Sequence, residues 1–332
     1  MATLESATKT VPSVSSEKTT PRKGMSPRAR RQTLAFYTFV APWLLGFVFL
    51  TIIPLIVGFL TSLTNYDGLN VFNLKFKGLE NYQRILSDSD AIFSIGRTIL
   101  WATLNVPAWI ILSLILALIL NQDIKWRGFF RTLFYLPNII PVVATVWVWK
   151  IFLDANNGVL NAIIRVFYPD LTIRWLSDYA LPSLTAISVW GGLGWGMVVF
   201  LAGLQGVPDE LKEAARIDGA NAIQVFFNIT LPILTPILFF MLINALIGSL
   251  QAFVIPLLLG SGGGQASVPP RATYLYMVHA FRQIFVNQRY GYSTALLWSL
   301  SIVLLTLSLV VFWSSRYWVH YEVAVEEGEG KA

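Results

Sequence analysis

The sequence contains no cysteine and only two histidines, His279 and His320. Without thiols the chain forms neither disulfides nor thiolate metal sites. The two histidines lie far apart in the sequence, so we expect no histidine-based metal cluster and interpret each as a polar residue at a membrane interface. Charged residues make up only 13% of the chain, whereas soluble domains carry about 25%. These absences argue against a soluble enzyme.

Long apolar runs take the place of the missing charges. Hydrophobic residues make up 55% of the sequence, and the mean hydropathy is +0.62. Runs of roughly eighteen or more residues without an ionised side chain are typical of membrane-spanning helices. We therefore predict an all-α, polytopic membrane protein. Six spans are expected, over residues 34–63, 98–120, 132–149, 181–204, 233–259 and 291–314.

The basic residues indicate an orientation in the membrane. Lys and Arg are frequent in the two termini and in the loops 121–131 and 205–232, so the positive-inside rule places these parts in the cytoplasm of a multi-pass cell (inner) membrane protein. The basic N-terminal tail can also contact anionic membrane lipid. Its Ser, Thr and Pro content predicts disorder. The predicted organisation is a disordered tail (1–33), a six-span domain (34–314) and a cytoplasmic C-terminal tail (315–332).

The expected spans are electrically neutral in their apolar cores, with Lys150 at the edge of the third span. Proton relays use ionisable residues at mid-depth, so proton coupling is disfavoured, whereas sodium coupling through backbone carbonyls stays open. Amides and indoles in the spans either tie helices together or line a path for an uncharged, polyhydroxylated solute. The candidates are Asn105, Asn138, Trp190, Trp195, Asn244, Ser249 and Gln251.

Two glycine-rich stretches allow different interpretations. "WGGLGWG", from Trp190 to Gly196, indicates either close helix packing or a locally unwound stretch beside a cavity. "GSGGGQASVPP", from Gly260, resembles a phosphate-binding loop, but no Lys-Ser/Thr pair follows it. The chain therefore has no nucleotide-binding P-loop, and any ATP must be bound by another polypeptide.

One charged segment interrupts the apolar pattern between Val207 and Leu234. Pro208 suits the first position of a helix, and the acidic residues that follow suit its positive first turn. Gly219 is a natural left-handed stop, so a short helix, a turn and a second amphipathic stretch are expected. This spacing alone is equally compatible with an ordinary loop helix. One narrow face of the first helix carries Leu211, Ala214, Ala215 and Asp218.

The same segment carries a recognisable signature. "EAARIDG", nine further residues and "ITLP" resemble the EAA motif of the membrane subunits of binding-protein-dependent ABC importers. "RGFFRTLFYLP" and "YGYSTAL" extend the resemblance over about residues 35–320, toward carbohydrate permeases of the maltose and glycerol-phosphate type. The resemblance implies that this loop docks on an ATPase and couples its closure to the spans. The coupling residues it implies are Leu211, Glu213, Ala214, Ala215, Asp218, Gly219, Ile229, Leu231 and Pro232.

The resemblance also implies an assembly. A second homologous permease would share the pore, an ABC ATPase dimer would bind ATP and Mg, and an extracytoplasmic solute-binding protein would deliver a sugar. The chain itself would hold no cofactor, catalyse no reaction and bind no nucleic acid.

By similarity, the substrate pathway includes Gly192, Trp195, Ser249 and Gln251. In several relatives only one permease of the pair touches the substrate, so the site lies on this subunit or on its partner, and the sequence does not name the sugar. An alternative is a stand-alone secondary carrier or channel for a neutral solute. A membrane enzyme is disfavoured because no paired carboxylates or histidines converge.

Overall fold

The computed structural model describes residues 27–69, 72, 74–260 and 271–320. The chain divides into two compact units, Met1–Val57 and Gly58–Ala332. The described residues are almost entirely helical, and their only β pairing is an isolated antiparallel bridge between Thr64 and Phe76. The predicted all-α class is confirmed. The first helix begins at Pro27, inside the segment expected as a tail, while residues 1–26 and 321–332 of the two predicted tails lie outside the described residues.

Within the described residues, five helical segments are long and apolar enough to cross a membrane. The first, Arg30–Ser62, joins α1 (Pro27–Phe47) to α2 (Ile53–Ser62) through a short π-helical turn. The others are α4 (Ser89–Asn121), α8 (Ala180–Gln205), α14 (Tyr290–Ser315) and the segment Ala222–Gly260, which contains α10 (Ala222–Val225), α11 (Leu231–Leu250) and α12 (Val254–Gly260).

The third expected span, residues 132–149, is not one helix. It is divided between α5 (Arg127–Ile139) and α6 (Val142–Phe152), whose axes differ by 98°. The break falls at Ile140 and Pro141, both in extended conformations. Proline has no N–H to continue the helical ladder and disfavours a helical residue before it. The two helices count as a sixth span only as a bent pair.

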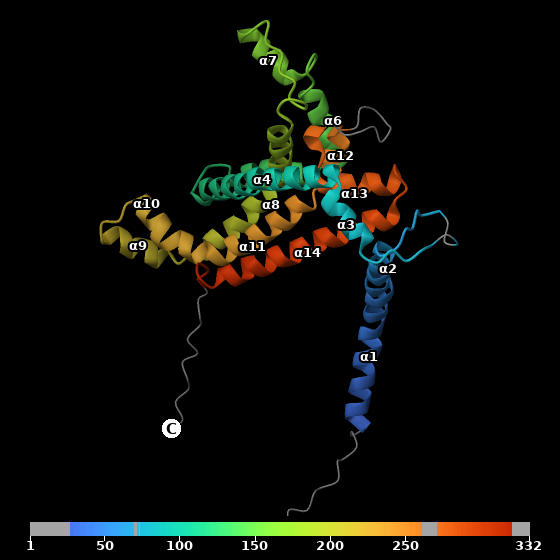
Figure 1. Ribbon diagram of the computed structural model, residues 1–332. Helices are drawn as coiled ribbons and strands as arrows, with labels where there is room; N and C mark the ends of the chain where they lie inside the picture. Colours follow the sequence, from blue (N-terminus) through green and yellow to red (C-terminus); the bar gives the residue numbers. More distant parts are fainter. Residues whose placement is uncertain (1–26, 70–71, 73, 261–270, 321–332) are drawn as a thin grey trace, which may run out of the picture. The chain divides into compact units, whose positions relative to one another are not determined.

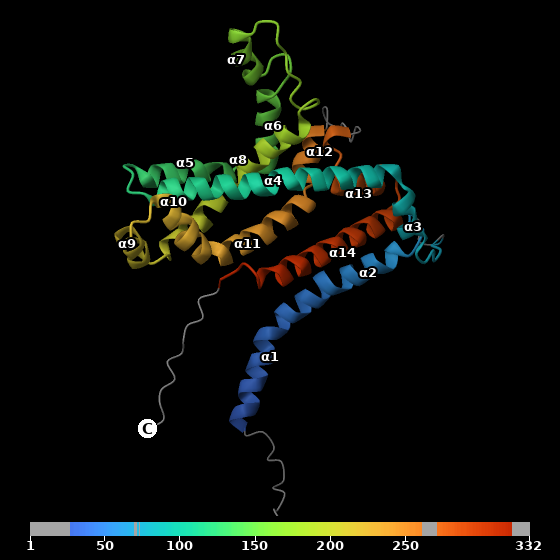
Figure 2. The same ribbon diagram turned by 60° about the vertical axis from the view of Figure 1, so that its left-hand side comes forward.

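Four short helices lie between the long ones. The helix α3 (Glu80–Ser87) is amphipathic, since Leu79, Tyr82, Ile85 and Leu86 recur at helical spacing. The others are α7 (Val159–Phe167), α9 (Asp209–Ile217) and α13 (Tyr276–Phe285). Figures 1 and 2 show α9 at one end of the long helices and α3 with α13 at the other. The glycine-rich loop 261–270 lies outside the described residues.

The helices α4, α8 and α11 pack around a buried core that includes Trp109, Phe200 and Leu234. The glycine-rich part of α8 lies within one continuous helix, which supports close packing over an unwound stretch. A Cβ atom at Gly194 would lie 2.6 Å from Tyr135 Cα on α5, which is too close for any side chain. Glycine here lets two helix backbones approach each other.

A buried polar cluster joins the helices at the α3 and α13 end. Asp88 caps α4 by accepting hydrogen bonds from the N–H groups of Asp90 (2.9 Å) and Ala91 (3.2 Å). It also accepts one from the Tyr292 hydroxyl at 2.7 Å. Burial alone would raise the pKa of Asp88, but these hydrogen bonds lower it below its ordinary value. We refer to Asp88, Tyr274, His279 and Tyr292 as the Asp88 cluster.

His279 lies inside this cluster, and the expectation of an interfacial residue is wrong for it, because its side chain is only 1% exposed. Its Nδ1 lies 2.7 Å from the Tyr274 hydroxyl, and its Nε2 lies 3.6 Å from Asp88 Oδ2. Burial lowers the pKa of His279, and the carboxylates of Asp88 and Asp90 oppose this only in part. The charged imidazolium is therefore disfavoured in this cluster.

Candidate functional site

A cavity of about 610 Å³ opens between α4, the α5–α6 break, α8, α11 and α12. Its volume falls within the range of small-molecule sites. Asn138, in the last turn of α5, and Ile140, at the break, both line it. The lining also includes Trp101, Asn105, Trp109, Val142, Thr145, Ile187, Ser188, Gly191, Gly192, Trp195, Asn244, Gly248, Ser249 and Phe253.

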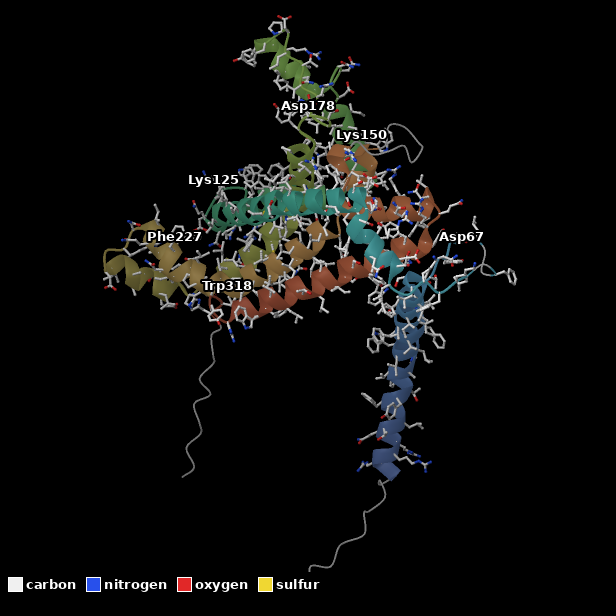
Figure 3. All side chains as sticks on the ribbon, viewed as in Figure 1. Asp67, Lys125, Lys150, Asp178, Phe227 and Trp318 are labelled. Carbon is white, nitrogen blue, oxygen red and sulfur yellow. The ribbon has the colours of Figure 1, made fainter. Side chains whose placement is uncertain are left out.

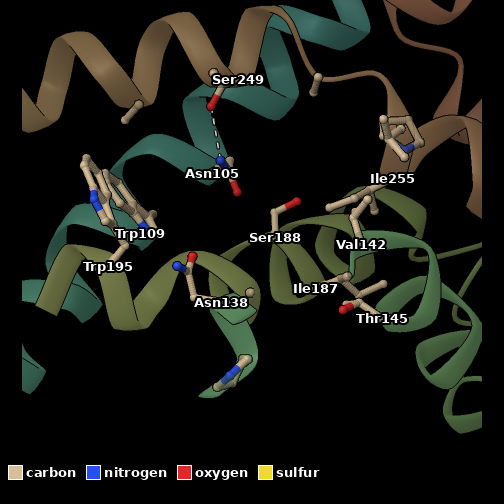
Figure 4. Close-up of a pocket in the computed structure, with 18 of the residues that line it drawn as sticks. Asn105, Trp109, Asn138, Val142, Thr145, Ile187, Ser188, Trp195, Ser249 and Ile255 are labelled. Atoms are coloured by element: carbon tan, nitrogen blue, oxygen red, sulfur yellow. Dashed lines mark hydrogen bonds between the residues drawn. The ribbon is translucent and has the colours of Figure 1, made fainter. Parts of the chain in front are cut away.

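A stacked pair of indoles forms one wall of the cavity. The rings of Trp109 and Trp195 lie 5.6 Å apart and within 11° of parallel, and Figure 4 shows them side by side at the edge of the pocket. A Cβ atom at Gly192 would lie 2.9 Å from Trp109 Nε1. The absence of a side chain at this position on α8 therefore lets the Trp109 ring lie against the helix.

Amide and hydroxyl groups also line the cavity. Asn105 Nδ2 donates a hydrogen bond to Ser249 Oγ at 3.1 Å, which joins α4 to α11 (Figure 4). The Asn105 Oδ1 atom is buried and accepts no hydrogen bond from the described residues. A buried, unpaired acceptor costs about 1–3 kcal/mol, so a hydroxyl donated by a ligand would stabilise this site. Figure 4 places Asn138 and Ser188 around the same space.

The described lining of the cavity is electrically neutral. None of the described lining residues is Asp, Glu, Lys, Arg or His. The described part of the chain also holds no group of three or more metal-ligating His, Cys, Asp or Glu side chains. An uncharged ligand fits such a lining, because a charged one would lose hydration without gaining a counter-charge.

The structure brings together three of the four residues expected on the substrate pathway. Gly192, Trp195 and Ser249 line the cavity, whereas Gln251 lies at the C-cap of α11 and is not among the lining residues. Trp190 packs edge-on against Trp149 and does not line the cavity either. Sequence reasoning missed Trp109. A signal was present in the sequence, since Asn105 and Trp109 lie four residues apart and therefore share one face of the expected second span.

The charged elbow (residues 208–232) has the geometry that its sequence predicts, with one difference. Pro208 is the N-cap residue of α9 and not its first helical residue. Gly219 has φ +89°, and its N–H donates to Arg216 O (3.1 Å) while Ala220 N–H donates to Ala215 O (2.9 Å). This pair of bonds is a Schellman motif, which requires the left-handed residue that glycine supplies.

The second half of the elbow is also fixed by local bonds. Asn221 and Gln224 form a reciprocal capping box at the start of α10. A π-helical turn, Phe226–Thr230, then carries Ile229 into α11, whose first residues are Leu231 and Pro232. The residues expected to couple the ATPase to the spans therefore lie on one continuous path from α9 to the cavity-lining helix α11.

The surface of α9 is left open. Leu211 is 47% exposed and none of the nine residues of the helix is buried. The Lys212 side chain donates to Asp209 Oδ1 at 2.8 Å, which lowers the pKa of Asp209. Figure 3 shows that side chains on this part of the molecule, such as Phe227, extend outward. The elbow therefore carries both apolar and charged side chains at its surface.

Comparison with known proteins identifies this architecture. Residues 109–319 match the family model described as "Binding-protein-dependent transport system inner membrane component". The chain belongs to this family. The permease is 37% identical to the probable ABC transporter permease protein YesP of Bacillus subtilis, over 88% of this chain and 94% of YesP. It is 28% identical to the diacetylchitobiose uptake system permease protein NgcF of Streptomyces coelicolor, over 89% and 87% of the two chains.

Solved structures agree on the fold. A chain of a bacterial ABC transporter that imports the acidic polysaccharide alginate superposes with a TM-score of 0.76 at 22% identity, covering 87% of this permease and 97% of that chain. The family is one of transport subunits, so this permease is a multi-pass inner-membrane protein and not an enzyme. Membership in a binding-protein-dependent system excludes the stand-alone carrier.

Proposed function

We propose that this permease carries a neutral carbohydrate and that part of the sugar-binding site lies on this subunit. The neutral cavity that holds the Trp109–Trp195 pair is the observation that carries the proposal. A flat indole packs against the apolar face of a sugar ring, while amides and hydroxyls pair with its hydroxyl groups. Named relatives that transport diacetylchitobiose or trehalose and maltose support a saccharide.

The charge of the lining supports an uncharged substrate. The structural neighbour imports an acidic polysaccharide, whereas a carboxylated or phosphorylated solute in this cavity would find no cation among the described lining residues. Burying an ion without a partner is unfavourable by several kcal/mol. A neutral saccharide or polyol avoids this cost.

The elbow supports the second half of the proposal, that the permease is driven by a separate ATPase dimer that binds ATP and Mg. The exposed face of α9 is available to a partner, and the turn at Gly219 joins it directly to α10 and α11. Movement of a docked α9 would be transmitted to the helix that carries Ser249. In this arrangement α9 and both termini are cytoplasmic, and a solute-binding protein delivers the sugar at the opposite end.

Uptake by the reconstituted complex tests the substrate class. Uptake of neutral di- and trisaccharides is measured for the wild type, Trp195→Ala and Trp195→Phe, with uronic-acid oligosaccharides as the charged comparison. We expect Trp195→Ala to raise the KM about tenfold or more, since one aromatic stacking contact contributes about 0.5–1.5 kcal/mol beyond its buried area. Trp195→Phe should retain most of the affinity.

An unchanged KM for Trp195→Ala would place the sugar site on the other permease. Preferred uptake of the charged oligosaccharides would contradict the neutral-substrate proposal. The assembly is tested separately by purifying the tagged chain in mild detergent and identifying the co-purifying polypeptides by mass spectrometry. Recovery of an ATPase and a second permease is expected, and recovery of this chain alone would contradict the proposed complex.

A further inference from the structure

One face of α4 lines the cavity with residues that recur every four positions. Trp101, Asn105 and Trp109 stand at i, i+4 and i+8, so their side chains lie one above the next on the helix, with about 5–6 Å between successive Cβ atoms. All three line the cavity. Trp109 stacks on Trp195, whereas Trp101 and Asn105 carry polar atoms that this stacking does not use.

Trp101 supplies a buried hydrogen-bond donor. The residue is only 3% exposed and belongs to the core cluster that includes Val146 and Leu184. Its Nε1–H is buried and has no acceptor among the described residues, although the N–H of a buried tryptophan usually finds a partner. The apolar ring explains how Trp101 packs, but packing does not explain an N–H group without an acceptor at the wall of a cavity.

Asn105 supplies the complementary acceptor one helical turn along α4. The bond from its Nδ2 to Ser249 Oγ (3.1 Å) holds the amide in place. The Oδ1 atom at the other end of the amide is buried and accepts no hydrogen bond from the described residues. Figure 4 shows this oxygen on the side away from Ser249, toward Ser188. The acceptor is therefore held in a fixed direction beside the cavity.

These two atoms are of opposite kind, and this limits the group that satisfies both. In the described part of the chain, Trp101 Nε1 and Asn105 Oδ1 are the buried side-chain atoms without a hydrogen-bond partner that belong to lining residues of the cavity. A hydroxyl group both accepts and donates a hydrogen bond, whereas a carboxylate only accepts and an ammonium only donates. A ligand with free hydroxyl groups therefore matches this donor and acceptor.

We propose that Trp101 and Asn105 select the substrate by binding the hydroxyl groups of one sugar ring. The Trp101 N–H donates to a sugar oxygen, and a sugar hydroxyl donates to Asn105 Oδ1. This inference rests on the proposed carbohydrate function and deepens it. The Trp109–Trp195 pair recognises the flat apolar face of a sugar, whereas Trp101 and Asn105 require free hydroxyls at one place on the ring. A site built to bond a hydroxyl rejects the analogue that lacks it, because the buried polar groups are then left unpaired.

Transport of deoxy sugars by single-site variants tests this selection. The complete importer, with its solute-binding protein, is reconstituted in proteoliposomes, and uptake of maltose, trehalose and diacetylchitobiose is compared with uptake of their monodeoxy derivatives. Trp101→Phe keeps an aromatic ring and removes the N–H, while Asn105→Leu replaces the amide by an apolar group of similar size. Trp190→Phe is the matched control, because this indole packs against Trp149 and does not line the cavity.

In the wild type we expect at least one monodeoxy derivative to have a kcat/KM about tenfold or more below that of its parent sugar. In Trp101→Phe and Asn105→Leu the parent should lose about tenfold in kcat/KM, mainly through KM, while that derivative should lose little. The preference for the parent then disappears. The solute-binding protein also discriminates between sugars, but its contribution is the same in every variant. Trp190→Phe should keep the wild-type preference.

A wild-type preference in both Trp101→Phe and Asn105→Leu would overturn the inference. Equal losses for the parent and its deoxy derivative would overturn it as well, because they indicate that the two residues only pack. Failure of the proposed function looks different, since the wild type would then transport none of the neutral saccharides, or Trp195→Ala would leave the KM unchanged. If Asn105→Leu does not assemble, Trp101→Phe decides the question, because it removes no hydrogen bond between described residues.

Discussion

The two ends of the helix bundle are held in opposite ways. At the α3 and α13 end, Asp88 bonds to Tyr292 across 204 residues, and Arg271 pairs with Asp90 across 181 residues. At the α9 end, the capping box and the Lys212–Asp209 pair each join residues three apart. The first end is therefore a tertiary structure whose polar side chains bond within the chain. The second is a locally folded elbow whose surface remains open to a partner.

This difference predicts how each end responds to substitution. Changes in the Asp88 cluster should lower stability, because they leave buried polar groups unpaired. Changes in the elbow should leave the fold intact and impair coupling, because the affected side chains are exposed until a partner covers them. The predictions below test this separation, from the largest expected effect to the smallest.

The largest effect is expected at Glu213. Glu213→Lys should reduce ATP-driven uptake about tenfold or more while the protein inserts and assembles normally, since a charge reversed inside a docked interface costs about 2–5 kcal/mol. Gly219→Pro should act similarly, because proline cannot adopt φ +89° and lacks the N–H that bonds Arg216. Uptake and ATP hydrolysis by the reconstituted complex are the measurements.

The control for Glu213→Lys is Asp123→Lys, which makes the same change of charge in the exposed 122–126 loop, outside the elbow. Its uptake should remain close to that of the wild type. Wild-type uptake by Glu213→Lys would refute the coupling role, and unfolding of that variant would contradict the contrast between the two ends.

The next effect is on stability. Asp88→Ala removes the N-cap of α4 and leaves the Tyr292 hydroxyl without its acceptor, so we expect a loss of about 2–4 kcal/mol in unfolding free energy. The measurement is the thermal stability of the purified complex by fluorescence-detected size exclusion. The matched control is Asp90→Ala, whose exposed pair with Arg271 should contribute at most about 1 kcal/mol. Equal losses from the two variants would show that the buried bonds do not stabilise this end.

The same contrast explains which features the sequence predicts. The elbow depends on neighbours in the chain, so the turn at Gly219 and the extent of α9 follow from local propensity and capping. The burial of His279 depends on Asp88, which lies nearly two hundred positions away, and no periodic pattern contains that pairing. The five long spans are predicted by composition, whereas the 98° bend at Pro141 is not, because proline is also tolerated within spans.

The substrate cavity was predicted from the sequence only in part. Trp195 and Ser249 were recognised by similarity to a family, and both line the cavity. Trp109 reaches the cavity only because Gly192 leaves space for its ring, and this complementarity between α4 and α8 is a tertiary property. Gln251 was also expected on the pathway. It is the C-cap residue that follows the last residue of α11, Leu250, and it does not line the cavity.

The third effect is a pH dependence that arises at the Asp88 cluster end. Because the folded-state pKa of His279 is lowered, the unfolded chain binds the proton first as the pH falls. The unfolding free energy should therefore be constant above about pH 6.5, decrease below it, and level off below the folded-state pKa, with a slope of at most about 1.4 kcal/mol per pH unit. Asp88, whose pKa is also lowered, acts in the same direction at lower pH.

Thermal stability between pH 5 and pH 8 measures this dependence. His279→Gln should flatten the part of the profile near pH 6. A slope that persists in His279→Gln would assign the titration to another group. The ionisable groups closest to His279 are Tyr274, Tyr292, Asp88, Asp90 and Arg282.

The smallest effect is expected at Asp209. Its pair with Lys212 is exposed on the carboxylate side, and water replaces such a partner readily. Asp209→Asn should therefore leave the melting temperature unchanged, although it alters the charge of the first turn of α9.

Uptake measured in low and high salt then separates two roles of this residue. If Asp209 only pairs with Lys212, uptake is unchanged at both salt concentrations. If the ATPase binds the charge of this turn, uptake falls in low salt and approaches the wild-type value in high salt, where charges are screened. A lower melting temperature would mean that the elbow is stabilised by its surface charges, and the contrast with the Asp88 cluster would then be one of degree.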